Sequence, residues 1–529
     1  MGSSSGLAAR ASLLDTLVAA FPHTVPGLGR EPNPALGIDP ASLSREDFAS
    51  WMGSGRFEAF ADALAKAGHC ANPIQLRGQS KRVDKATGEI LSSYSSAEEP
   101  GGITYVPCGN RREDICPYCS RLYAGDTFQL LRAGIVGGKT VPEHVADNPL
   151  VFATFTAPSF GPVHTRAQGT GGCHPHIRGP ERCPHDRPRR CSRRHTEDDE
   201  QLGQPLCADC YDYESHLVWN WWAPALFRRF TIALRRSLAK DLGIAATRFG
   251  EVATLQYAKV AEPQRRVAIH FHALIRLDGP RTHEGFAPAA ATIDAQRLAW
   301  HVRRVAAQVR LEVRGVDDDD LRRVLRFGRQ LDARPVTTRR RPDDPERDLA
   351  PEQVAGYLAK YITKSTGGEG AGNAHHRRLR TVGRSLAARA RQAARAQTED
   401  EDDEPPYARL GKWVHMYCFR GHFSSKSRRY SITLGALRRA RRRARALLAN
   451  AERTGTPVDL AAMEAELLAD EDDTETTLVI GSWAFNGTGW ADETERTLAL
   501  ASAALAREYD REKAAQRNNR KQSNSERKR

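Results

Sequence analysis

Strict alternation of apolar and polar positions marks residues 267–275. In the run Val-Ala-Ile-His-Phe-His-Ala-Leu-Ile the odd-numbered residues are all apolar, and His270 and His272 occupy two of the even positions. A period of two is typical of a β-strand with one buried face. The pattern therefore predicts a strand that projects two imidazoles, about 7 Å apart, from its other face.

The preceding apolar segment, residues 254–260, is followed by a polar turn and predicts the hairpin partner of this strand. Folding the hairpin about residue 264 places Gln256 opposite His272. Gln256 is therefore a candidate third metal ligand. Glu251, further back, is the alternative that would supply a charge, and an ordinary surface position remains open for both residues.

A helical pattern covers residues 351–364, which begin with proline and stop before a glycine pair. At 3.6 residues per turn, Tyr357, Lys360, Tyr361 and Lys364 share one face. A phenol with a pKa near 10 is a poor nucleophile at neutral pH, but adjacent cations and a metal-polarised phosphate favour its attack. The helix thus offers nucleophilic tyrosines; the alternative is an amphipathic helix with tyrosines at the core edge.

The rest of the pattern predicts an α+β domain whose central antiparallel sheet is flanked by helices. Its further elements are a strand over residues 151–156 and helices over 118–133 and 222–239; an amphipathic piece at 57–67 precedes them, and a strand or two at 413–423 and an arginine-dense helix at 437–451 follow. The expected organisation is an unassigned N-terminal region, 1–100; the α+β domain, 101–365, with an insertion at about 157–217; a charged linker, 366–410; a mixed, partly helical basic region, 411–510; and a disordered tail, 511–529.

The ten cysteines form two CxxC pairs and a dense cluster with histidines. CxxC pairs are the usual halves of a tetrahedral structural zinc site, so Cys116, Cys119, Cys207 and Cys210 are expected to share one zinc ion, with Cys108 as an alternate ligand. A redox role is the competing interpretation, but neither pair follows a strand in a βαβ setting. Only Cys70 and Cys418 fit well as core thiols.

Within the insertion, cysteines and histidines crowd a Pro-, Arg- and Gly-rich stretch that offers almost no hydrophobic core. A second zinc site is expected to order it, most plausibly from Cys173, Cys183, Cys191 and His195, with His185 nearby. The alternative is a basic loop with incidental cysteines. Its arginines at 187–194 would suit phosphate contacts.

Charge points to an anionic partner. The 529-residue chain carries a formal net charge of +14 and has a pI of about 9.4, which favours nucleic acid. Basic runs at 426–429 and 438–445 lie near Trp413, Tyr417, Phe419 and Tyr430; they would either hold phosphates and stack on bases or form a solvated helix. No long apolar run or signal peptide is recognisable, so we expect a cytoplasmic protein with no membrane partner.

Three motifs in order give a resemblance to a known family. Val-Phe-Ala-Thr-Phe-Thr at 151–156, His270-Phe-His272 and Tyr-Leu-Ala-Lys-Tyr-Ile-Thr-Lys at 357–364 resemble the motifs of HUH rolling-circle replication initiators, especially those of actinobacterial plasmids and integrative conjugative elements. The resemblance implies an HUH nicking endonuclease domain over 101–365. It also implies Mg²⁺ or Mn²⁺ at the histidines, Tyr361 as principal nucleophile and Tyr357 as the second.

The implied activity is nicking of origin DNA by tyrosine transesterification, which leaves a 5′-phosphotyrosine and a free 3′-OH, with a host helicase and polymerase as partners. A conjugative relaxase would carry its tyrosine ahead of the histidine motif, whereas here it follows. An HUH transposase keeps this order and is the enzymatic alternative. A non-catalytic, zinc-stabilised DNA-binding regulator would explain the charge and the cysteines but not the tyrosine helix.

Overall fold

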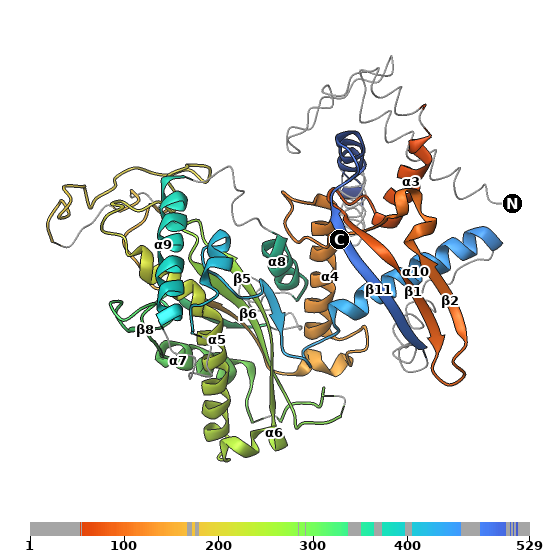
Figure 1. The fold of residues 1–529 in the computed structure, drawn as a ribbon. Helices are drawn as coiled ribbons and strands as arrows, with labels where there is room; N and C mark the ends of the chain where they lie inside the picture. Colours follow the sequence, from red (N-terminus) through yellow and green to blue (C-terminus); the bar gives the residue numbers. More distant parts are fainter. Residues whose placement is uncertain are drawn as a thin grey trace. The chain divides into compact units, whose positions relative to one another are not determined.

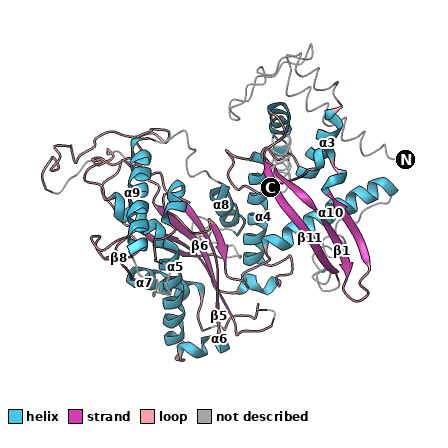
Figure 2. Ribbon diagram, in the orientation of Figure 1, coloured by secondary structure: helices cyan, strands magenta, loops and turns pink. Residues whose placement is uncertain are grey.

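The computed structural model describes residues 53, 55–166, 172–174, 179–283, 285–290, 292–336, 351–363, 373–396, 405–455, 477–503, 508, 512, 515 and 516. The chain divides into two compact units (Figure 1). Unit 1 comprises residues 1–127, 363–365 and 433–529, and unit 2 comprises 128–362 and 366–432. Each unit has its own sheet, as the strand colouring of Figure 2 shows.

Unit 2 is built on a five-stranded sheet in the order β10-β5-β6-β4-β9, in which every neighbouring pair is antiparallel. The strands are β4 (Leu150–Phe155), β5 (Thr254–Pro263), β6 (Ile269–Asp278), β9 (Leu331–Pro335) and β10 (Ser424–Lys426). A two-stranded sheet joins β7 (Leu311–Val313) to β8 (Arg323–Leu325). The mixed α+β class with an antiparallel sheet is confirmed.

Alternation along β6 separates the two faces of this sheet. Phe271, Ala273 and Ile275 are buried in the main hydrophobic core, which also takes in the apolar faces of α5 (Tyr213–Asp241) and α7 (Ala295–Gln308). The even-numbered residues, including both histidines of the motif, face the other way because successive strand side chains alternate. The helices therefore cover one face and leave the histidine face to other elements.

Residues predicted as a charged linker contain a buried helix instead. Helix α9 (Ala374–Ala396) contributes Leu379 and Leu386, both fully buried, to the main core. A strand or two was predicted over residues 413–423, but residues 413–416 belong to the 3₁₀ helix η7 (Leu410–Met416), which packs against α9. The linker prediction is wrong for α9 because arginine-rich composition hides apolar positions spaced at helical intervals.

The remaining helices of unit 2 are short or lie near its limits. They are α6 (Phe249–Val252), α8 (Pro351–Thr363), η5 (Glu143–Asp147) and η6 (Ala246–Arg248), while α4 (Pro117–Val136) contributes its residues from Phe128 onward.

Unit 1 combines the two ends of the described chain. Its sheet runs β11-β1-β2, with β3 pairing β1; the strands are β1 (Ile74–Asp84), β2 (Ile90–Ser95), β3 (Thr104–Val106) and β11 (Thr477–Thr488). Its helices are α3 (Arg56–Ala67), η3 (Ser96–Glu98), η4 (Pro100–Gly102) and α10 (Leu434–Thr454). Trp490 closes the core: its ring lies against Phe60 and Tyr105, and its Nε1 donates to the Cys70 carbonyl at 2.8 Å.

Among the described residues, no helix is both long enough and apolar enough to cross a membrane. The predicted tail, 511–529, lies almost wholly outside the described residues.

Candidate active site and metal-binding groups

Three potential ligands converge on the open face of the β5–β6 hairpin. The Nε2 atoms of His270 and His272 are 2.8 Å apart, and Oε2 of Glu262 lies 3.1 and 3.2 Å from them. Glu262 is paired directly opposite His270 in the strand register, so its side chain leaves the same face. All three side chains are largely removed from solvent.

The third ligand predicted from sequence is wrong. The hairpin turns about residue 266, so Gln256 pairs with Arg276, and its Oε1 accepts from Ser427 at 2.8 Å. Glu251 lies on α6, exposed and paired with Arg248. The tight turn has Val267 at a positive φ of 57°, with its N–H donating to the Gln264 carbonyl, and this lengthens β5 beyond the predicted bend.

Neighbours on β4 fix the orientation of His272. Its Nδ1 lies 3.0 Å from Oγ1 of Thr154, and its ring is stacked on Phe152 with an interplanar angle of 8°. Burial lowers the pKa of His272, which favours the neutral imidazole that a metal ion requires. Burial opposes ionisation of Glu262, but hydrogen bonds from both imidazoles outweigh it and bring the pKa of Glu262 to about 2.

The donor set fits a six-coordinate divalent cation. Bonds of about 2.1 Å at right angles would separate neighbouring ligand atoms by about 3.0 Å, close to the three distances above. Two imidazoles and a carboxylate occupy one side of such a sphere and leave the opposite positions for water or phosphate oxygen. The residues present are therefore suited to Mg²⁺ or Mn²⁺.

Tyr357 on α8 approaches these ligands. Its ring centroid lies 5.3 Å from that of His272 and 6.0 Å from that of Phe152, edge to face in both contacts. The buried side of α8 is formed by Val354, Ala355 and Leu358, while Tyr357 remains 41% exposed. The helix therefore presents a partly open phenol beside the predicted metal ligands, as its sequence period indicates.

Tyr361 and Lys360 belong to the same helix, but their side chains lie outside the described residues, as does all of Lys364. The assignment of Tyr361 as principal nucleophile stays a prediction.

Four cysteines of unit 1 form one compact group, which we call the cysteine group: Cys70, Cys108, Cys116 and Cys119. Sγ of Cys70 lies 3.7 Å from both Cys116 and Cys119. Backbone N–H groups of Ala71, Cys108 and Asn110 donate to sulfur atoms of the group. Hydrogen bonds from Cys108, Cys119 and Cys70 lower the pKa of the Cys116 thiol well below its usual range.

The insertion between β4 and α5 carries two further groups. The first insertion group consists of His164, Cys173, Cys191 and His195, and the second of Cys183, His185, Cys207 and Cys210. In the first, Nε2 of His195 lies 3.1 Å from Nδ1 of His164 and 3.5 Å from Sγ of Cys191. In the second, Nδ1 of His185 lies 3.3 and 3.9 Å from the two sulfur atoms of the CxxC pair.

Further hydrogen bonds favour the metal-binding forms of side chains in both insertion groups. Nδ1 of His195 donates to Asp199 at 2.7 Å, so its Nε2 is left for the group. Desolvation opposes ionisation of the Cys183 thiol, but backbone N–H groups of Arg187 and His185 lower its pKa to about 6. Both features favour metal-ligand forms of these side chains.

This grouping corrects the sequence prediction. Cys116 and Cys119 group with Cys70 and Cys108, whereas Cys207 and Cys210 group with Cys183 and His185. Cys108 is a member of the cysteine group, and Cys70, interpreted as a core thiol, is another. Cys183 and His185 leave the predicted second site to complete the second insertion group, and His164 replaces them.

The comparisons with known proteins agree on one family. Residues 56–504 match the family model described as "RepSA: Replication initiator protein, pSAM2". A curated relative, a replication initiator protein of Streptomyces ambofaciens, is 39% identical over 463 residues, which cover 85% of this chain and 91% of the relative. The chain belongs to the RepSA replication initiator family. The resemblance found in the sequence is thereby confirmed, and a replication initiator is favoured over a transposase.

No solved structure matches this initiator. The function of its site is therefore inferred from the geometry of its own side chains.

The basic runs of the initiator differ from the composition-based expectation. Tyr417, Phe419 and Tyr430 are buried, at 2%, 0% and 0% exposure, so these rings support the core of unit 2 and are not free to stack on bases. Trp413 is only partly buried and packs against the same core. The arginines of 438–445 lie on α10, which belongs to unit 1.

Sequence reasoning missed Glu262, Cys70 and His164. Glu262 carried a usable signal: it is the acidic residue of the hairpin segment 254–266, which precedes the two histidines. His164 and Cys70 had no local spacing motif, because each joins its group from a distant part of the chain.

Proposed function

We propose that this replication initiator nicks one strand of its origin DNA by tyrosine transesterification and so starts rolling-circle replication as an HUH endonuclease. The observation that carries the proposal is the contact of the Tyr357 ring with His272, on the face where Glu262, His270 and His272 converge. A partly exposed phenol next to a divalent-cation site is the arrangement that phosphodiester attack requires.

The chemistry balances without a further co-reactant. The phenol oxygen of a tyrosine on α8 forms a bond to phosphorus, its proton passes to solvent, and the P–O3′ bond breaks. The O3′ atom leaves with a proton, so the products are a 5′-phosphotyrosine and a free 3′-OH. A divalent ion held by Glu262, His270 and His272 would supply Lewis-acid stabilisation of the phosphate charge.

Two tyrosines one helical turn apart support a second transfer. Tyr357 and Tyr361 are four positions apart in α8, the spacing that brings two residues to one side of a helix. One phenol can hold the DNA while the other attacks when the displaced strand is complete. Origin DNA is the substrate that this scheme implies, with host helicase and polymerase acting on the exposed 3′-OH.

The test incubates the initiator with single-stranded oligonucleotides that tile the origin, together with Mg²⁺ or Mn²⁺. A covalent adduct should appear on a denaturing gel and should be lost in the Tyr357→Phe, Tyr361→Phe double variant. Glu262→Gln should abolish nicking, whereas Glu251→Gln, a matched change at the exposed glutamate of α6, should not. Cleavage by the double variant would overturn the proposal.

We further propose that the cysteine group and both insertion groups each hold one structural Zn²⁺ ion. For Zn–S bonds of about 2.3 Å and Zn–N bonds of about 2.0 Å, a tetrahedron separates its ligand atoms by about 3.8 Å for S–S, about 3.5 Å for S–N and about 3.3 Å for N–N. The observed separations of 3.7 Å (S–S), 3.5 Å (S–N) and 3.1 Å (N–N) agree with these edges.

Metal analysis of the purified initiator tests the zinc proposal. We expect three equivalents of zinc per chain, and loss of one equivalent in each of Cys119→Ser, Cys191→Ser and Cys207→Ser. The buried thiol of Cys418, which belongs to no group, provides the control, since Cys418→Ser should keep all three. Fewer than three equivalents in a freshly purified protein would contradict the assignment.

A further inference from the structure

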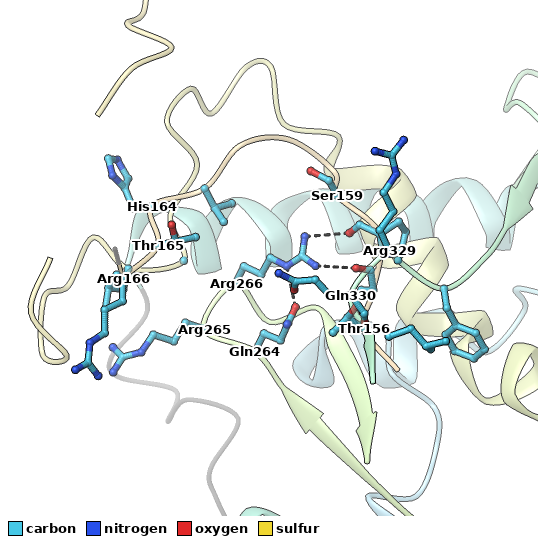
Figure 3. Close-up of a pocket in the computed structure, with 18 of the residues that line it drawn as sticks. Thr156, Ser159, His164, Thr165, Arg166, Gln264, Arg265, Arg266, Arg329 and Gln330 are labelled. Carbon is cyan, nitrogen blue, oxygen red and sulfur yellow. Dashed lines mark hydrogen bonds between the residues drawn. The ribbon is translucent and has the colours of Figure 1, made fainter. Parts of the chain in front are cut away.

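A large arginine-lined cavity opens where the insertion meets the end of the unit 2 sheet (Figure 3). Its volume is about 1020 Å³, at the upper end of the range for ligand pockets. Its wall combines the end of β4 and the segment after it, the β5–β6 turn, part of the insertion, the end of α7 and the segment before β9.

The cavity continues the same sheet face that carries the metal ligands. On β4, Thr154 contacts His272, and Thr156, two residues further, lines the cavity. On the neighbouring chain segment, Glu262 is a ligand candidate, and Gln264, again two residues further, lines the cavity. Two residues of a strand advance by about 7 Å, which is about two nucleotides at the 3.4 Å spacing of a stacked strand.

The cavity carries a strong positive charge. Its lining holds six arginines and one glutamate: Arg166, Arg265, Arg266, Arg310, Arg326, Arg329 and Glu197. Figure 3 shows Arg329 on the opposite side of Arg266 from Arg166 and Arg265. The carboxylate of Glu197 pairs with Arg166 at 3.4 Å, whereas Arg265 donates to the Glu197 backbone carbonyl, so this glutamate offsets only part of the charge.

The arginines of the cavity differ in whether their guanidinium groups are already hydrogen-bonded to the protein. Arg266 donates to the carbonyls of Ala157 and Pro158 at 3.1 and 3.0 Å and so braces the wall. Within the described part of the chain, the exposed guanidinium groups of Arg326 and Arg329 have no hydrogen-bond or ion-pair partner. Cations that the fold leaves unpaired in a concave site are suited to an anionic ligand.

We propose that this cavity binds single-stranded DNA within a few nucleotides of the scissile phosphate. The inference rests on the proposed nicking activity for the position of the strand, but the binding itself needs only the cavity. The free arginines hold backbone phosphates, while Gln264 and Gln330 at the floor offer amide groups to base edges. The insertion thereby acts as one wall of the DNA channel, and its zinc groups keep that wall in place.

Binding of a fluorescent (dT)₂₀ strand without Mg²⁺ or Mn²⁺ tests the site apart from nicking. The double variant Arg326→Ala, Arg329→Ala should weaken binding at least tenfold. The slope of log Kd against log salt should fall by about 1.4, because each of two phosphate contacts in a single strand contributes about 0.7. Arg236→Ala, at an exposed arginine of α5, is the matched control and should bind like the wild type.

Replacement of the two free arginines by lysine separates charge from shape. Lysine keeps the phosphate-binding charge, so the double lysine variant should recover most of the affinity that the alanine variant loses. Equal affinity and equal salt slopes for wild type and alanine variant would overturn the proposal.

Cross-linking locates the bound DNA strand relative to the nicking site. Nicking-site oligonucleotides that carry 4-thiothymidine at single positions should cross-link to the cavity-lining peptides only within about three nucleotides of the nick, at the two-residue spacing given above. Cross-links at distant positions alone would show that the cavity does not adjoin the active site. If the initiator binds and cross-links the strand but does not nick it, the proposed nicking function is wrong and the DNA-binding cavity is supported. If the initiator nicks DNA but the arginine variants bind it normally, the DNA-binding cavity is wrong and the nicking function is supported.

Discussion

A hydroxyl on the neighbouring strand contributes to the orientation of His272. Its Nδ1 lies 3.0 Å from Oγ1 of Thr154, while its Nε2 faces Glu262 and His270. Outer partners of this kind fix the tautomer and ring angle of a ligating histidine. Thr154 is therefore a positioning residue for the proposed metal site.

Replacing Thr154 by valine should raise the Mn²⁺ concentration needed for half-maximal nicking by about 10–100-fold. The nicking rate at saturating Mn²⁺ should change little, because the ligands themselves remain. A titration of activity against Mn²⁺ measures both quantities, and Thr154→Ser, which keeps the hydroxyl, is the control. An unchanged half-saturation in the valine variant would contradict this role.

Lys259 is a charge buried on the helix-covered face. It lies 6% exposed on β5, with its Nζ 4.3 Å from the ring centroid of Phe271 and 4.8 Å from that of Phe227. Burial lowers the pKa of Lys259 to about 8. Between pH 8 and 10.5 the unfolded chain holds a proton that the folded chain does not, so the stability of unit 2 rises with pH across this window.

Lys259→Met should raise the free energy of unfolding at pH 7 by about 3 kcal/mol, the equivalent of about 2.5 pKa units. The advantage of the variant should shrink as pH increases from 8 to 10.5. Urea unfolding of both proteins at several pH values measures the difference. A difference that is constant with pH would show that packing, not charge, determines it.

Among single residues, the sequence predicted those that a local pattern of apolar and polar positions identifies. His270 and His272 follow from strict alternation, and Tyr357 follows from helical period. Glu262 was missed because the predicted register was wrong by four residues. The sequence placed Gln256 opposite His272, whereas the structure pairs Val260 with His272, since the tight turn at Val267 shifts the bend of the hairpin.

The insertion is the element that depends most on its ligand groups. Residues 172–174 and 179–212 have few buried apolar side chains but carry both insertion groups. Asp199 is the outer partner of one of these groups, through its hydrogen bond to His195. The order of this element should therefore follow zinc occupancy.

Asp199→Asn should weaken zinc binding at the first insertion group by about 10–100-fold. Competition with a chromophoric zinc chelator measures the affinity, and Asp198→Asn, at an exposed neighbouring aspartate, is the control. Release of zinc at the same chelator concentration in both variants would contradict the role of Asp199.

Elements were predictable where one period dominated. The strands of the hairpin and helix α8 follow from their patterns, whereas α9 was missed because arginines surround its buried leucines. The ligand groups were predictable only in part. A CxxC pair indicates half of a metal site, but only the fold determines which distant residues complete the site.

At the scale of the whole molecule, the described residues form two cores that share no buried residue. One core includes Phe155 and Trp219 of unit 2, and the other includes Phe60 and Leu498 of unit 1. Separate cores make two-state unfolding an unsuitable description of the full chain. The cysteine group lies in the second core alone.

Calorimetry should therefore show two unfolding transitions. Cys116→Ser should lower the midpoint of one transition and leave the other in place, because the cysteine group stabilises unit 1 only. Nicking of a short single-stranded substrate measures unit 2 separately, and we expect it to persist in this variant. A joint downward shift of both transitions would show that the units unfold together.

The pairing of β1 with β11 has a consequence for the order of synthesis. The strands join residues 74–84 to 477–488, and all of the five-stranded sheet lies between them in the chain. On the ribosome, the strands of that sheet and helix α8 emerge before β11, while β1 waits for its partner. A chain that ends before β11 would thus contain the whole of unit 2, attached to a unit 1 that lacks a strand of its sheet.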